Sequence, residues 1–207
     1  MRKVYKNFLG VIIVLILLTI LLLMGYKYLM HGKSEIEVVD SVKKYGYTLK
    51  DRDTEYMQTV FADLKEVLNN KEINYNKYAS DITKLFVSDL FTLDNKINKY
   101  DVGGYEYVYP DKVKNFKLNV TNTIYKYMEN NVNGKRNQKL PVVNNVVINN
   151  VENVDYNIEK ESYKGKRMNI EINYDEDLGY DKKANITCII KDDKIYIVSY
   201  KAEEHEE

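Results

Sequence analysis

The sequence predicts an α+β domain that follows a single apolar segment near the N-terminus. Two patterns in the chain lead to this prediction. Apolar residues recur at helical spacing from about residue 53 to 128, and apolar and polar residues then alternate from 142 to 201. Helices grouped before a run of antiparallel strands are typical of α+β domains, in which amphipathic helices cover one face of a sheet. We therefore expect three amphipathic helices packed on one strongly curved antiparallel sheet.

The first element is an uncharged stretch over residues 7–26. At a rise of about 1.5 Å per residue, a helix of this length covers the roughly 30 Å of bilayer hydrocarbon, so we expect one transmembrane helix here. Residues 1–6 hold three basic side chains and no acid, which predicts a cytoplasmic tail and an extracytoplasmic C-terminal domain. A cleaved signal peptide would have a shorter apolar region that ends in small residues. Retention as an uncleaved anchor is thus expected.

Charge and cysteine content limit the function of the outer part. The chain holds 31 basic and 31 acidic residues, and the outer part, with 28 basic residues against 31 acidic, is slightly negative. A basic surface for nucleic acid is therefore not expected. The single cysteine, Cys188, excludes an internal disulfide and lies in an apolar run. An exported domain without disulfides, rich in Lys, Asn, Ile and Tyr, suits a Gram-positive bacterium.

Two helices are expected at the start of the outer domain. Residues 27–50 contain little apolar periodicity and are interpreted as a stalk. The apolar spacing then predicts helices at Asp53–Asn69, with Asp51 or Asp53 as its cap, and at Tyr75–Phe91. Asp81 falls off the apolar stripe of the second helix and is expected in solvent.

A short strand and a third helix are expected next. The alternating, aromatic run Tyr105–Tyr109 has the composition of a strand. Pro110 ends that strand and suits the start of a helix, whose apolar spacing continues to about Met128. The residues from Asn130 to Lys139 are then expected to form a polar loop.

Four antiparallel strands complete the predicted domain, which spans residues 51–201. They are expected at Val142–Ile158, Tyr163–Tyr174, Lys183–Lys191 and Ile195–Lys201. Asp192 and Asp193 predict a tight hairpin between the last two strands. Residues 202–207 are charged and are expected to be a disordered tail.

This order of elements resembles the cone-shaped nuclear transport factor 2-like fold over roughly residues 50 to 201. A basic tail, one anchor and an exported cone are similar to the inner-membrane scaffold subunit of type IV secretion and conjugation machines, and to its Gram-positive relatives. The segments Phe86-Val-Ser-Asp-Leu-Phe-Thr-Leu-Asp-Asn-Lys and Asp101-Val-Gly-Gly-Tyr-Glu-Tyr-Val look like exported proteins of low-GC Gram-positive bacteria. The resemblance implies a scaffold and transfers no catalytic residue.

Asp89 is the first candidate for a functional site. Some cones of this fold enclose a pocket in which a carboxylate and tyrosines transfer protons. Asp89 is spaced i+3 and i+4 from Phe86 and Leu85, which places it to face inward toward Tyr105 or Tyr107. The alternative is a structural aspartate that caps a helix or accepts hydrogen bonds.

The loop that contains Asp101, Gly103 and Gly104 is the second candidate. A calcium loop of the EF-hand type would need an oxygen ligand and a glycine at the positions of Lys96 and Lys99, so that reading is rejected. We expect a turn in which Asp101 bonds nearby backbone amides and the two glycines supply unusual dihedral angles. The alternative is a loop that binds a partner protein.

Catalytic motifs are missing from the sequence. It has no Gly-x-Ser-x-Gly, no cysteine–histidine pair and no phosphate-binding glycine loop, and its two histidines, His31 and His205, lie beside the anchor and in the tail. We expect no enzyme, cofactor or metal, but a membrane-anchored scaffold that binds envelope proteins and self-associates. The alternative is an anchored cone with a ligand-binding or enzymatic pocket.

Overall fold

The computed structural model describes residues 14–24 and 36–203. Residues 14–24 are helical and exposed, and within the described ranges no helix is both long enough and apolar enough to cross a bilayer. The basic tail, the two ends of the predicted transmembrane helix and residues 204–207 lie outside the described residues. Contacts divide the chain into two units, and the larger one, Ile36–Asn131 with Arg136–Glu207, contains the α+β domain.

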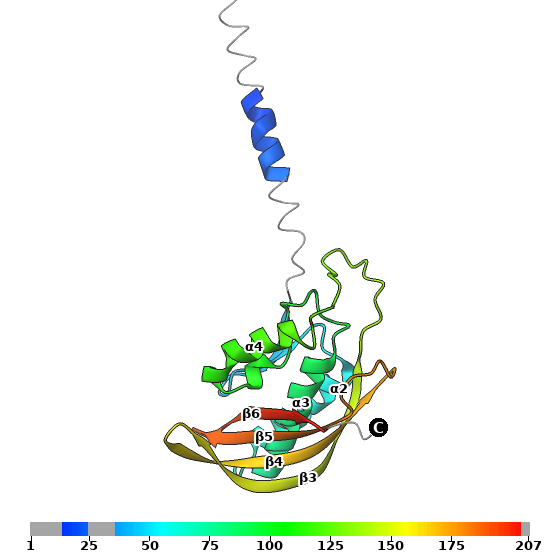
Figure 1. Ribbon diagram of the computed structural model, residues 1–207. Coiled ribbons are helices and arrows are strands. Elements are labelled where there is room, and N and C mark those ends of the chain that lie inside the picture. Colours follow the sequence, from blue (N-terminus) through cyan, green and yellow to red (C-terminus); the bar gives the residue numbers. More distant parts are fainter. Residues whose placement is uncertain (1–13, 25–35, 204–207) are drawn as a thin grey trace, which may run out of the picture. The chain divides into compact units, whose positions relative to one another are not determined.

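A curved antiparallel sheet forms one layer of this domain (Figure 1). Its strands follow the chain order: β3 (Val143–Ile158), β4 (Glu161–Tyr174), β5 (Lys183–Lys191) and β6 (Lys194–Ala202). All four lie within about two residues of the predicted bounds, but the tail prediction is wrong for residues 202 and 203, because Ala202 belongs to β6 and the Glu203 amide donates to the Lys183 carbonyl. Asp192 and Asp193 form the tight turn between β5 and β6, with φ angles of 51° and 60°, as a type I′ hairpin requires. β3 and β6 are the two edges of the sheet.

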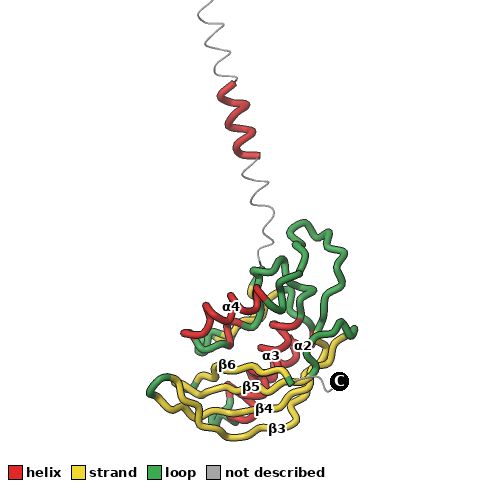
Figure 2. Tube along the Cα trace, viewed as in Figure 1, coloured by secondary structure: helices red, strands yellow, loops and turns green. Residues whose placement is uncertain are grey.

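The helices lie on the concave side of the sheet (Figures 1 and 2). α3 (Tyr75–Phe91) is the central helix, and most of its residues are buried. α2 (Glu55–Asn69) packs beside α3 and is capped by Thr54, whose side chain accepts from the Met57 amide. The bounds of both helices are close to the prediction, but the predicted cap of α2 is wrong: Thr54 caps the helix, and the Asp53 carboxylate accepts instead from the Lys50 amide at 2.8 Å. The third, α4 (Val113–Asn122), ends six residues before the expected Met128, because the chain turns at Thr123.

The domain begins earlier than predicted. A hairpin of β1 (Val38–Val42) and β2 (Tyr47–Lys50) occupies most of the segment that was interpreted as a stalk. Tyr45, Tyr47 and Leu49 are buried in the main core. The stalk interpretation is therefore wrong for residues 36–50, because these side chains pack against the helices instead of lying in solvent.

Residues Tyr105–Tyr107 form a 3-10 turn, not the predicted strand. Gly104 precedes this turn with a φ of 75°, which bends the chain as the turn begins. Only Val108 pairs with the sheet, as a single parallel bridge to Ile197 of β6. A second 3-10 turn, Pro110–Lys112, then leads into α4.

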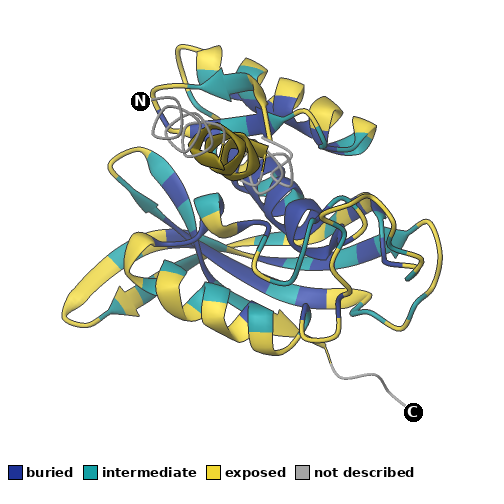
Figure 3. Cartoon of the chain, turned by 90° about the horizontal axis from the view of Figure 1, so that it is seen from above, coloured by how far each residue is buried: buried dark blue, intermediate teal, exposed yellow. Residues whose placement is uncertain are grey.

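Asp81 is buried, against the expectation of a solvated side chain. α3 has neighbours on several sides, so a residue outside its apolar stripe is still covered, as the central buried region in Figure 3 illustrates. Lys77, one helical turn earlier, lies 3.4 Å from the Asp81 carboxylate. Burial raises the pKa of Asp81 to about 6, although Lys77 and Lys84 oppose that change.

Candidate functional site

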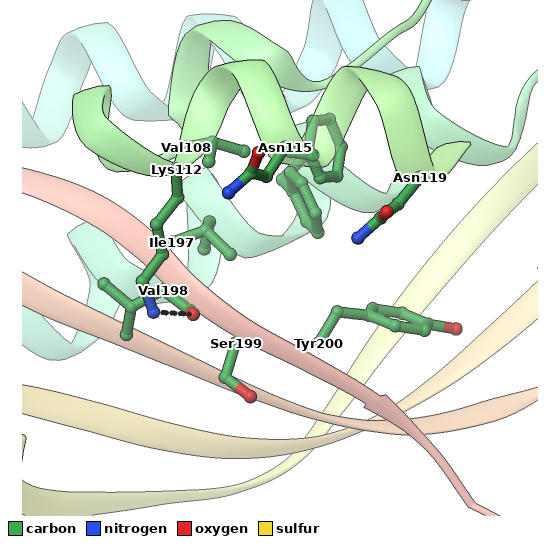
Figure 4. Close-up of a pocket in the computed structure, with 10 residues that line it drawn as sticks. Val108, Lys112, Asn115, Asn119, Ile197, Val198, Ser199 and Tyr200 are labelled. Carbon is green, nitrogen blue, oxygen red and sulfur yellow. Dashed lines mark hydrogen bonds between the residues drawn. The ribbon is translucent and has the colours of Figure 1, made fainter. Parts of the chain in front are cut away.

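A groove of about 320 Å³ lies between α4 and the edge strand β6 (Figure 4). The α4 wall presents Asn115, Phe116 and Asn119, and the β6 wall presents Val198, Ser199 and Tyr200. Asn115 and Asn119 project from the helix into the space above the strand (Figure 4). The volume falls at the lower end of the range of about 300 to 1,000 Å³ that small ligand sites occupy.

The course of the chain around Pro110 explains why this groove is open. The Tyr109 amide donates to the Ile197 carbonyl at 3.0 Å, so residues 108–109 begin a parallel strand beside β6. Pro110 has a fixed φ and begins the 3-10 turn Pro110–Lys112 in place of further extended chain. The chain turns away and becomes α4. The next part of the β6 edge is left beside the helix without a neighbouring strand.

Lys112 closes one end of the groove. Its ammonium donates to the Val198 carbonyl at 3.0 Å, which Figure 4 marks, and to the Tyr156 hydroxyl at 3.2 Å. The same ammonium lies 5.2 Å from the centre of the Tyr156 ring. Lys112 therefore satisfies one carbonyl of the strand edge and brings a positive charge to the groove.

The chemistry of the groove walls suits binding. Phe86 of α3 and Phe116 of α4 form an apolar contact at the groove, with ring centres 5.8 Å apart. Asparagine amides and a serine hydroxyl supply donors and acceptors around it. The residues that line the groove include no carboxylate, histidine or cysteine. The titratable side chains in this lining are Lys112 and Tyr200.

Asp89 lies inside the protein and is fully paired. Its carboxylate accepts from the Lys96 ammonium at 2.7 Å and from the Gly104 amide at 2.7 Å, and the Lys50 ammonium is 3.4 Å away. The Lys96 side chain has no exposed surface. Burial alone would raise the pKa of Asp89, but the charges of Lys96 and Lys50 outweigh it and hold the pKa below its ordinary value. Asp89 therefore stays ionised and acts as a structural anion.

The two tyrosines predicted beside Asp89 point to different places. Tyr107 is buried and stacks on Tyr47, with ring centres 5.6 Å apart. Tyr105 is 38% exposed, and the Lys117 ammonium lies 3.4 Å from its ring centre. Asp89, Tyr105 and Tyr107 do not line the groove described above. Its lining instead takes in Val108, the residue next to Tyr107.

The loop with Asp101, Gly103 and Gly104 fastens the chain to α3. Asp101 forms a bidentate ion pair with Arg52 and accepts from the Ile97 amide at 3.0 Å. A Cβ at Gly103 would lie 1.9 Å from the Asp89 carbonyl oxygen, so close approach requires glycine here. Gly104 alone of the two has a positive φ, at 75°. The expected turn is present, but the reason for Gly103 is contact and not an unusual dihedral angle.

Sequence reasoning missed the groove residues. Two features of the sequence could have indicated them. Pro110 marks the end of the extended segment, and Asn115 and Asn119 are four residues apart, which places them on one face of α4. Within the described ranges, no group of three or more histidine, cysteine or acidic side chains is placed to hold a metal ion. Comparison with protein-family models, curated proteins and solved structures found no match for this chain.

Proposed function

We propose that this chain is a single-pass, membrane-anchored scaffold whose extracytoplasmic domain binds other envelope proteins and does not catalyse a reaction. The observation that supports the proposal is that the buried Asp89 carboxylate is already paired inside the protein. The best-placed candidate for an inward-facing catalytic acid is occupied by Lys96, Lys50 and the Gly104 amide. A carboxylate held in this way has neither a raised pKa nor access to a substrate, so proton transfer finds no support.

The groove beside α4 supports binding as the activity of the domain. It combines phenylalanine rings with amide and hydroxyl groups at an open strand edge, which are the means by which proteins recognise other proteins. The volume alone would also suit a small ligand, and a ligand-binding cone is the alternative. The alternative predicts an acid in the cavity, and the groove lining contains none.

The proposed location follows from the N-terminal sequence. Residues 7–26 are uncharged and residues 1–6 are basic, so the domain would be held outside the membrane by one helix. Within the α+β class we assign the domain to the nuclear transport factor 2-like cones, an assignment that the order of helices and the curved sheet support. A scaffold of a Gram-positive conjugation or secretion machine is the setting that combines such a cone with such an anchor.

Photocrosslinking in intact cells tests this function. A photoreactive amino acid is placed in the full chain at exposed positions spread over the domain, such as Asn119, Tyr127 and Asn157. We expect defined crosslinks to other envelope proteins or to a second copy, and loss of those crosslinks when residues 1–26 are deleted. A chain that yields no protein crosslink from any position would contradict the scaffold proposal.

A further inference from the structure

We infer that the groove between α4 and β6 receives an extended, acidic segment of a partner protein, which adds to the sheet as a strand along the open edge of β6. This inference rests on the proposed function and names the class of partner. Strand addition obtains affinity from main-chain hydrogen bonds and specificity from the pockets that alternate side chains enter. A strand edge beside a groove provides both.

The chain itself shows that this edge accepts a parallel strand. Val108 already pairs with Ile197, and the Tyr109 amide donates to the Ile197 carbonyl. Pro110 ends that pairing after a single bridge. Among the described residues, the main-chain groups of β6 beyond Val198 have no partner on this side of the strand. A segment from another protein could therefore continue the parallel pairing along β6 that Val108 begins.

The surfaces of the groove suit such a segment. The side chains of Asn115 and Asn119 stand across from the strand edge (Figure 4), and Phe116 also lines the groove. An added strand would lie about 4.8 Å from β6, with its main chain along Ser199 and Tyr200. Alternate side chains would then point toward the phenylalanine rings, where apolar or β-branched residues fit.

The charge around the groove selects an acidic segment. Lys112 is the charged residue of the groove lining. α4 adds Lys114 and Lys117 and holds no acidic residue, while Asp111 stands directly before Lys112 and Glu129 follows Met128. On the β6 side, the nearby Asp181 carboxylate is engaged by the Tyr200 hydroxyl at 2.8 Å. Aspartate or glutamate in the partner would meet the Lys112 ammonium at the end of the groove, whereas lysine or arginine would be repelled by it.

Peptide selection on the full chain tests the inference. The protein is held in nanodiscs of neutral phosphatidylcholine and exposed to a phage-displayed library of random twelve-residue peptides. Selected peptides are synthesised, and their binding to wild type is compared with binding to Asn119→Trp, which fills the groove. Leu118→Trp, on an exposed neighbouring position outside the groove lining, is the matched control. Each peptide is also made with alternate amides N-methylated, which removes the donors a strand needs.

The expected result is enrichment of peptides with acidic residues and alternating apolar residues. Binding should weaken at least tenfold in Asn119→Trp and at least tenfold on N-methylation, but less than twofold in Leu118→Trp. Selected peptides that bind Asn119→Trp as tightly as wild type would overturn the inference, as would a selection that enriches no acidic peptide. Binding of anionic vesicles, but of no peptide, through α4 would assign the lysines to lipid and overturn it too. Crosslinks in cells from other faces of the domain would leave the scaffold proposal standing in those cases.

Discussion

The ion pair of Asp89 and Lys96 offers a demanding test of the structure. We consider Asp89→Asn, which keeps the size of the side chain, and Lys96→Met, which keeps its length. Removing one partner of a buried pair typically costs about 3 to 5 kcal/mol, because the other charge is left without compensation. The two variants should differ in a definite direction, because the two charges have different remaining partners.

The remaining partners set the order of the two effects. Without Lys96, the Asp89 carboxylate keeps the Gly104 amide at 2.7 Å and the Lys50 ammonium at 3.4 Å. Without the Asp89 carboxylate, the Lys96 ammonium has no ion-pair partner among the described residues and keeps only neutral side-chain oxygens, such as that of Asn95 at 2.8 Å. Asp89→Asn should therefore cost about 4 to 5 kcal/mol and Lys96→Met about 3 kcal/mol. The double variant should cost less than their sum by about 2 to 3 kcal/mol.

Cys188 provides the assay for this cycle. It is the one cysteine of the chain and is fully buried. Burial raises the pKa of its thiol to about 12, so a thiol reagent at pH 8 should modify it only when the domain opens. Labelling of the full chain in detergent micelles at increasing urea then gives the free energy of unfolding. A cycle that is additive within about 0.5 kcal/mol, or a larger cost for Lys96→Met than for Asp89→Asn, would refute the reasoning.

Three further changes test other parts of the fold by the same labelling. Gly103→Ala should lower the free energy of unfolding by about 3 kcal/mol or more, because the added Cβ would lie 1.9 Å from the Asp89 carbonyl oxygen. The control is Gly179→Ala, at a φ of 78° with no atom near the added Cβ, which should cost about 1 to 2 kcal/mol. Equal costs for the two variants would contradict the close packing of Gly103 on α3. Since burial raises the pKa of Asp81 to about 6 from 3.8, folded protein binds an extra proton between those values and wild type should lose stability as pH rises through this window. Asp81→Asn should remove that loss. Above pH 6 the variant should be more stable than wild type by about 1 to 2 kcal/mol, with allowance for partial solvent screening. A variant with the same pH profile of stability as wild type would be inconsistent with a buried Asp81 carboxyl. Tyr47→Phe should lower the free energy of unfolding by about 1 to 2 kcal/mol, because the buried Tyr47 hydroxyl donates to the Ile195 carbonyl at 2.9 Å. A variant as stable as wild type would mean that the β1–β2 hairpin is not part of the core.

Much of the fold follows from local sequence because local physics determines it. α3 begins and ends at the predicted residues, since its apolar stripe is continuous and Asn74 caps its first turn. The β5–β6 hairpin was predictable from Asp192 and Asp193, which tolerate the positive φ of a tight turn. The β1–β2 hairpin was missed, although Tyr45, Tyr47 and Leu49 alternate around Gly46 in a manner that indicates a strand.

The charged interior could not be predicted in the same way. Lys96 lies in a polar loop, where sequence pattern favours an exposed side chain. Its burial depends on Asp89, one element away, and on the close approach that Gly103 allows. The helical spacing correctly predicted that Asp89 lies on the inward face of α3. Whether an inward carboxylate meets a substrate or a lysine depends on tertiary contacts that local patterns do not contain.

The groove shows how one residue can decide whether a sheet edge is closed. The aromatic run before Pro110 has high strand propensity, and continuation of that strand would have covered β6 and left no space for a partner. Proline stops the ladder at Val108 and provides the fixed φ with which a helical turn begins. Exposed edges are usually blocked by charge or by covering elements, since they invite pairing with other chains. Here α4 stands beside the edge without pairing to it, and Lys112 satisfies only the Val198 carbonyl. An edge that is flanked but not sealed in this way leaves room beside Ser199 and Tyr200 for the single added strand that we propose.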